Sequence, residues 1–143
     1  KPEIEKYGVE PKYIELEVTE SVLIADFESV ANKLKELKEY GVRVSLDDFG
    51  TGLSSLNSLR KLPFDILKLD KDFFQKDQIT KRERIVISNI VRLGKELAMS
   101  IVSEGVETIE QINFLKDIQC PVIQGYYFSK PIHYSEFLSK YLL

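Results

Sequence analysis

Two adjacent aspartates, Asp47 and Asp48, lie near the end of the strand-like segment VRVSLDDF (42–49), directly before Gly50 and Gly52. A carboxylate is costly to bury unless it has an ionic partner or a metal ion. Successive side chains of a strand point to opposite faces, so both aspartates can serve one site only where the strand ends and turns into a loop. The pair therefore predicts a functional site at the end of this strand.

Four further strand-like segments each carry a polar residue among apolar neighbours. They are 13–20 with Glu17, 65–70 with Lys68, 100–107 with Glu104 and 121–128 with Gln124. Purely structural parallel strands are expected to be almost continuously apolar. A lone acidic residue is typical of a solvated surface position. Polar residues in five strands, several of them at or near the carboxyl end, instead indicate a shared site, because that end carries the catalytic groups of α/β barrels.

The residue types indicate the chemistry of such a site. Converging carboxylates from Glu17, Asp47, Asp48 and Glu104 would repel one another unless cations lay between them. Oxygen-rich clusters select hard divalent ions such as Mg²⁺ or Mn²⁺. Lys68 would add a fixed positive charge where an anion is held and cleaved. The residues alone therefore predict metal-assisted chemistry on a phosphate-like substrate.

Helix-like segments separate these strands along the whole chain. They are predicted at 26–41, 54–63, 80–99, 108–117 and 135–143, with capping boxes at Thr80–Glu83 and Thr108–Gln111. Five successive β-α units predict a parallel sheet with helical crossovers. A complete α/β barrel takes ~250 residues, or about 31 per unit. The 143 residues therefore predict either an open α/β sheet or an incomplete barrel.

Composition narrows the classes of partner. A net charge of −3 argues against DNA or RNA polymers as partners, although a small nucleotide held through metal ions remains compatible. Cys120 is the lone cysteine, so no internal disulfide forms and a reducing, cytoplasmic setting is expected. No apolar run approaches the ~18 residues of a membrane span. The first residue is Lys1 rather than Met, and we expect the chain to be part of a longer protein.

Two other interpretations of residues 48–52 fail. A protein kinase carries Asp-Phe-Gly as well, but it also needs an His-Arg-Asp loop and an upstream strand lysine, and neither is present. The Gly-Thr-Gly of residues 50–52 lacks the spacing of a dinucleotide-binding fingerprint. His133 is predicted to be a surface residue, and Cys120 a small residue that packs in a loop.

Five motifs, in order along the chain, resemble the C-terminal part of an EAL domain, the family of cyclic di-GMP phosphodiesterases of bacterial signalling. They are ELEVTES (15–21), SLDDFGTGLSSL (45–56), LPFDILKLDKDFF (62–74), SEGVET (103–108) and QGYYFSKPI (124–132). The resemblance spans essentially residues 1–143. It implies a TIM-barrel-like (β/α) fold, here an incomplete barrel of about five β-α units.

The resemblance also implies roles for individual residues. Glu17, Asp47, Asp48 and Glu104 match metal ligands for two Mg²⁺ or Mn²⁺ ions, and Glu104 is sometimes assigned as the general base. Lys68 matches the lysine that orients the attacking water and the substrate phosphate. Gln124 and Asp70 match the substrate and water network. Glu20 resembles the residue that steadies the DDFGTG loop, which is tied to activation and dimerisation.

The reaction implied is hydrolysis of one phosphodiester bond of cyclic di-GMP to linear pGpG by a two-metal mechanism. The resemblance also implies a homodimer. In the parent protein it implies attached sensory or GGDEF domains, and other domains of that protein are compatible with a membrane anchor. The family's Glu-Ala-Leu glutamate and an asparagine ligand, both on early strands, are absent from these residues. We therefore expect the chain alone to be inactive. The alternative is a non-catalytic EAL-like module that binds cyclic di-GMP or a partner protein.

Overall fold

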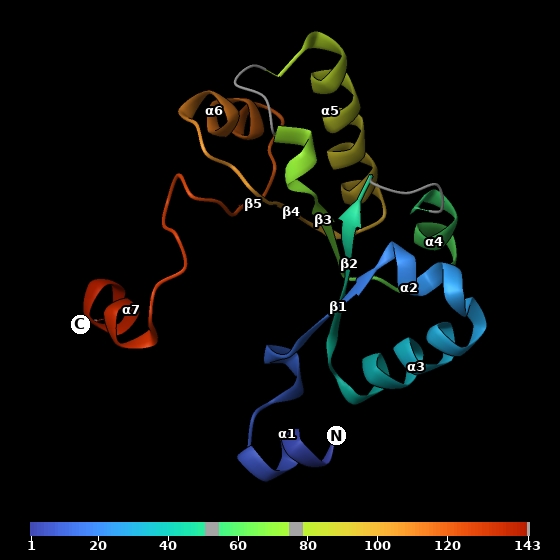
Figure 1. Cartoon of the computed structure of the whole chain (residues 1–143). Coiled ribbons are helices and arrows are strands. Elements are labelled where there is room, and N and C mark those ends of the chain that lie inside the picture. The colour runs from blue at the N-terminus through green and yellow to red at the C-terminus, as the bar shows by residue number, and fades with distance from the viewer. Residues whose placement is uncertain (51–54, 75–78, 143) are drawn as a thin grey trace.

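The computed structural model describes residues 1–50, 55–74 and 79–142, and in them helices and strands alternate (Figure 1). The strands are β1 (Glu15–Thr19), β2 (Arg43–Phe49), β3 (Ile66–Leu69), β4 (Ser100–Ser103) and β5 (Val122–Ile123). The α-helices are α1 (Pro2–Tyr7), α2 (Glu20–Ala25), α3 (Phe27–Tyr40), α4 (Ser55–Lys61), α5 (Lys81–Glu96), α6 (Ile109–Asp117) and α7 (Tyr134–Tyr141). Two short 3₁₀ helices are η1 (Pro11–Tyr13) and η2 (Lys71–Phe74).

The described strands form one parallel sheet in the order β1-β2-β3-β4-β5. Each strand pairs with the next strand along the chain, and the order never reverses. A doubly wound open sheet reverses its strand order, whereas a barrel adds strands in sequence. Of the two predicted architectures, the sheet therefore has that of an incomplete (β/α) barrel.

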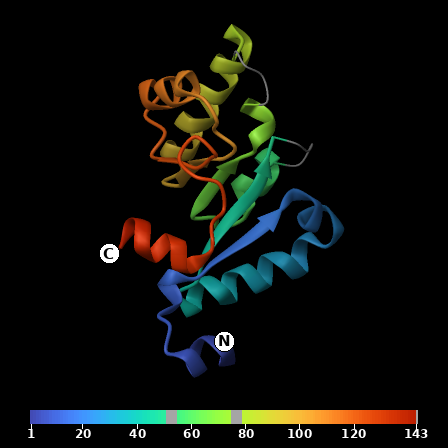
Figure 2. The same ribbon diagram turned by 60° about the vertical axis from the view of Figure 1, so that its left-hand side comes forward.

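An apolar core lies between the sheet and its helices. Val44, Leu46 and Leu67 are fully buried on the strands and pack in one cluster with Leu34 of α3 and Ile87 of α5. Helices α3 and α4 lie on one side of the strands and α7 lies apart on the other (Figures 1 and 2). Because all five described strands run parallel, their carboxyl ends lie at the same edge of the sheet.

Two predicted strands are much shorter in the structure. The segment 100–107 is extended only to Ser103, because Gly105 takes a left-handed conformation with φ 67° and turns the chain away. The segment 121–128 is extended only to Ile123, because the N–H of Phe128 donates to the carbonyl of Gly125 and closes a turn. The residues beyond these two strand ends are loops at the carboxyl edge of the sheet.

Both predicted capping boxes are present, at Thr80–Glu83 and Thr108–Gln111. Helices α1 and α2 were not predicted from the sequence. His133 is exposed as expected, and its side chain caps α7. Within residues 1–50, 55–74 and 79–142, no helix combines the length and apolar character needed to cross a membrane.

Candidate functional site

The side chain of Lys68 lies at the centre of a carboxylate cluster at the carboxyl edge of the sheet. Its Nζ is 2.5 Å from Glu17 Oε1 on β1 and 3.3 Å from Asp47 Oδ1 on β2. It is also 2.8 Å from Oε1 of Glu104, which follows β4. Lys68 itself is only 7% exposed. Glu17 is 51 positions from Lys68 and 87 positions from Glu104 in the sequence, and one ammonium group thus joins these distant residues.

A β-bulge places Asp48 in the same region as Asp47. Leu46 pairs with Leu67 and Phe49 with Leu69, so two residues of β2 stand opposite the single residue Lys68 of β3. Asp48 takes up the extra length with φ 56°, a left-handed conformation that aspartate tolerates better than most residues. The strand predicted at 42–49 is confirmed as Arg43–Phe49, and both aspartates lie within its last three residues. The bulge, which was not predicted from the sequence, brings the two carboxylates into one region.

The charges in this cluster shift the pKa values of Lys68 and Asp48. Burial lowers the pKa of Lys68, but its hydrogen bonds to Glu104 and Glu17 outweigh burial and hold that pKa well above its ordinary value. The pKa of Asp48 is raised, first by burial and then by the negative charges of Asp47 and Asp70. The raised pKa keeps the Lys68 ammonium charged, and the raised pKa of Asp48 reflects the negative charge already gathered around it.

The donor chemistry of this cluster suits a hard divalent cation, because its oxygens come from carboxylates of Glu17, Asp47, Asp48 and Glu104. Among the residues that the structure describes, no three Asp, Glu, His or Cys side chains are arranged as ligands of one ion. The geometry gives the reason, since three of these carboxylates converge on the Lys68 ammonium. The Lys68 ammonium therefore supplies positive charge that balances these three carboxylates.

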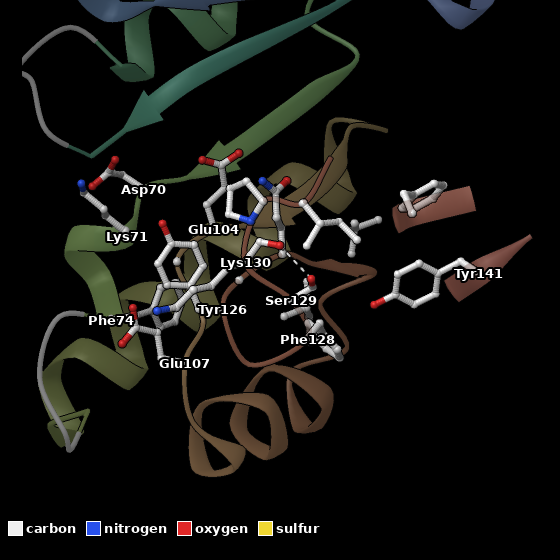
Figure 3. A pocket seen from close by; sticks show the side chains of 18 of the residues that line it. Asp70, Lys71, Phe74, Glu104, Glu107, Tyr126, Phe128, Ser129, Lys130 and Tyr141 are labelled. Atoms are coloured by element: carbon white, nitrogen blue, oxygen red, sulfur yellow. Dashed lines mark hydrogen bonds between the residues drawn. The ribbon is translucent and has the colours of Figure 1, made fainter. Parts of the chain in front are cut away.

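A cavity of about 1300 Å³ opens beside the cluster. Asp48, Asp70 and Glu104 line it on the side of the sheet, and Tyr141 lines it from α7, as the close view in Figure 3 shows for three of these four. The side chain of Gln124 also faces this cavity. The predicted residues Asp48, Asp70, Glu104 and Gln124 therefore line one cavity, and Glu104 connects it to the cluster around Lys68.

The structure does not describe every residue predicted for the site, and it adds residues that were not predicted. The backbone of Glu20 begins α2, but its side chain lies outside the described residues, as do residues 51–54 of the DDFGTG loop. Sequence reasoning missed Lys71, which lines the cavity directly after Asp70. Its position beside a predicted site residue was the available signal. It also treated Gln111 only as a helix cap, although this side chain joins two loops of the site.

The fold and the cluster define a barrel-type α/β domain with an acidic, lysine-centred site at the carboxyl edge of its sheet. The family model of the EAL domain matches residues 2–131. The chain therefore belongs to the EAL domain family.

Relatives agree with this assignment over nearly the whole chain. The cyclic di-GMP phosphodiesterase NbdA of Pseudomonas aeruginosa is 40% identical over 141 residues, covering 96% of this chain and 18% of that protein. The PaMucR phosphodiesterase in complex with c-di-GMP superposes with a TM-score of 0.87 at 38% identity, covering 94% of this chain and 55% of that one. The manganese and cyclic di-GMP complex of Klebsiella pneumoniae BlrP1 gives a TM-score of 0.85 at 31% identity, covering 91% and 33%. The chain spans only 15–18% of the length of the first curated relatives that it matches.

Proposed function

We propose that this chain is the substrate- and metal-binding part of a cyclic di-GMP phosphodiesterase domain, which hydrolyses cyclic di-GMP to linear pGpG. The observation that carries the proposal is the contact of the Lys68 ammonium with Glu17, Asp47 and Glu104 at the carboxyl edge of the sheet. The names of NbdA and PaMucR support the same reaction. The BlrP1 complex supports the use of a divalent cation beside this substrate.

In this proposal Glu17, Asp47, Asp48 and Glu104 hold two Mg²⁺ or Mn²⁺ ions. Divalent ions supply a bound water of lowered pKa and stabilise negative charge on phosphate oxygens. Lys68, whose ammonium stays charged, orients the attacked phosphate and its water by hydrogen bonding. Water adds across one phosphorus–oxygen bond: its oxygen joins phosphorus, and the released ribose oxygen takes up a proton. In this proposal Glu104 accepts the proton of that water.

The cavity beside the cluster supports a role in substrate binding for Asp70 and Gln124, because both line it with Asp48 and Glu104. The small share of each relative that this chain covers supports further domains, of the sensory or GGDEF type, in the parent protein. A homodimer in which the DDFGTG loop and Glu20 take part is proposed from the family resemblance. A cytoplasmic location for this domain is proposed from the lone cysteine.

The test is turnover of cyclic di-GMP, followed by chromatography of pGpG with Mg²⁺ or Mn²⁺ present. The chain and its parent domain are compared, each with Asp47→Asn. The matched control is Asp117→Asn, which makes the same change of charge at an exposed position of α6. We expect turnover by the parent domain, loss of at least about a hundredfold with Asp47→Asn, and no change with Asp117→Asn. The chain alone is expected to turn over little, because the early glutamate and asparagine ligands lie outside it.

Retained turnover in Asp47→Asn would contradict the assigned site. Binding of cyclic di-GMP by the parent domain with no hydrolysis would favour the alternative, a non-catalytic EAL module. Fluorescent cyclic di-GMP binding measured on the same samples separates these two results.

A further inference from the structure

Gln111 is a buried polar side chain that the proposed chemistry does not use. It is 3% exposed and lies in the first turn of α6. Its Oε1 accepts hydrogen bonds from the backbone N–H groups of Glu107, at 2.7 Å, and Thr108, at 3.0 Å. Because two N–H groups point at the same atom, that atom is the amide oxygen, and the amide nitrogen faces the other way.

The amide nitrogen of Gln111 reaches a different part of the site. Nε2 donates to the backbone carbonyl of Phe74 at 2.9 Å, across 37 positions of sequence. Phe74 closes η2, the 3₁₀ helix that begins directly after Asp70. A helix cap needs only the amide oxygen of this side chain. The bond to Phe74 is therefore additional to capping and joins the segment after β3 to the segment after β4.

The two joined segments carry site residues and are in close contact. The N–H of Glu104 donates to the carbonyl of Leu69 at 3.0 Å. A Cβ on Gly105 would lie 2.3 Å from Cβ of Lys71, so the loop after β4 rests on the first residue of η2. Asp70 is held by its own turn, in which its Oδ1 accepts from the N–H of Asp72 at 2.7 Å.

We infer that Gln111 is a positioning residue, whose carboxamide fixes the loop that carries Glu104 against the turn that carries Asp70. The inference rests on the proposed function for the roles of Glu104 and Asp70, and on the hydrogen bonds alone for the link between the loops. Gln111 touches neither carboxylate and acts only through the two backbone segments. Groups that orient metal-binding side chains from behind typically change metal affinity about 10- to 100-fold when lost.

Three variants separate positioning from capping. Gln111→Glu keeps the acceptor for Glu107 and Thr108 but loses the donor to Phe74. Gln111→Leu loses both functions. The matched control is Thr108→Ala. It removes the other half of the capping box, in which the backbone N–H of Gln111 donates to Thr108 Oγ1 at 3.2 Å. It leaves the carboxamide of Gln111 in place. Thermal melting first establishes that each variant folds. If Gln111→Leu does not fold, Gln111→Glu is the decisive variant.

The first measurement is amide hydrogen exchange. We expect residues 71–74 to exchange about tenfold faster in both Gln111 variants and to be unchanged in Thr108→Ala. The amides of Glu107 and Thr108 should lose protection in Gln111→Leu and keep it in Gln111→Glu. Unchanged exchange at 71–74 in both Gln111 variants would overturn the inference.

The second measurement is the dissociation constant for Mn²⁺ alone, by isothermal titration calorimetry. It should rise about tenfold in both Gln111 variants and stay within about twofold of wild type in Thr108→Ala. An equal rise in Thr108→Ala, or an unchanged dissociation constant in both Gln111 variants, would overturn positioning. If Mn²⁺ binding and exchange follow expectation while the parent domain leaves cyclic di-GMP intact, the proposed function fails and the positioning role stands.

Discussion

Replacing Lys68 by methionine tests the idea that its ammonium balances the charge of the acidic site. Methionine keeps most of the apolar stem but leaves Glu17, Asp47 and Glu104 facing one another without a cation. These three side chains are 53%, 19% and 25% exposed, so each pair lies between a surface pair and a buried one. An exposed pair contributes about 0.2–1 kcal/mol, and breaking a fully buried pair costs about 3–5 kcal/mol. We therefore expect a loss of about 2–3 kcal/mol without metal.

The assay is urea unfolding followed by circular dichroism, with and without Mn²⁺. Saturating Mn²⁺ should restore much of the stability lost in Lys68→Met, because the ion supplies the missing positive charge, and a ligand at a hundred times its Kd stabilises by about 2.7 kcal/mol. The wild-type chain should gain less, since its ammonium competes for the same carboxylates. The control is Lys38→Met, which removes a 2.6 Å pair with Asp65 outside the site.

Two results would refute this reasoning. The first is a metal-free Lys68→Met chain as stable as Lys38→Met, which would mean that the carboxylates need no counter-charge. The second is an equal gain from Mn²⁺ in wild type and Lys68→Met, which would mean that ion and ammonium do not share partners.

Three further predictions follow from the packing. Gly125→Ala should destabilise by about 3 kcal/mol, because its Cβ would lie 2.0 Å from the Val106 carbonyl oxygen. Gly8→Ala meets no atom within 4 Å and should cost only about 1 kcal/mol, from its left-handed φ of 64°; equal losses in urea unfolding would contradict this. Asp65→Ala should cost about 2 kcal/mol by stripping the Val44 N–H of its 2.9 Å acceptor, more than Lys38→Met costs in the same assay. Burial raises the pKa of the Cys120 thiol, so a thiol reagent should label it slowly until urea is added, and fast native labelling would count against its burial.

Local patterns in the sequence predicted much of this fold. The five strands, their parallel arrangement and both capping boxes follow from apolar periodicity and from short-range side-chain bonds. The same patterns placed polar residues near strand ends, and the structure brings Glu17, Asp47, Lys68 and Glu104 into one cluster. These signals are readable because neighbouring residues alone determine them.

The lengths of two strands were not readable in this way. The run YYF after Gly125 has strong strand character, yet it turns, because Gly125 lies against the backbone of Val106 and the N–H of Tyr127 donates to the Val106 carbonyl. A loop more than fifteen residues earlier in the chain thus overrides the local preference of this segment.

The sequence by itself determined the family, the alternation of elements and the residue types of the site. Tertiary structure decided the rest: the sequential strand order of a barrel, the bulge that puts Asp48 beside Asp47, and the carboxamide bridge of Gln111. Each of these depends on pairing between segments that are distant along the chain. Strand register and the path of a loop are fixed only when those segments meet, because their backbone groups must then find partners in one another.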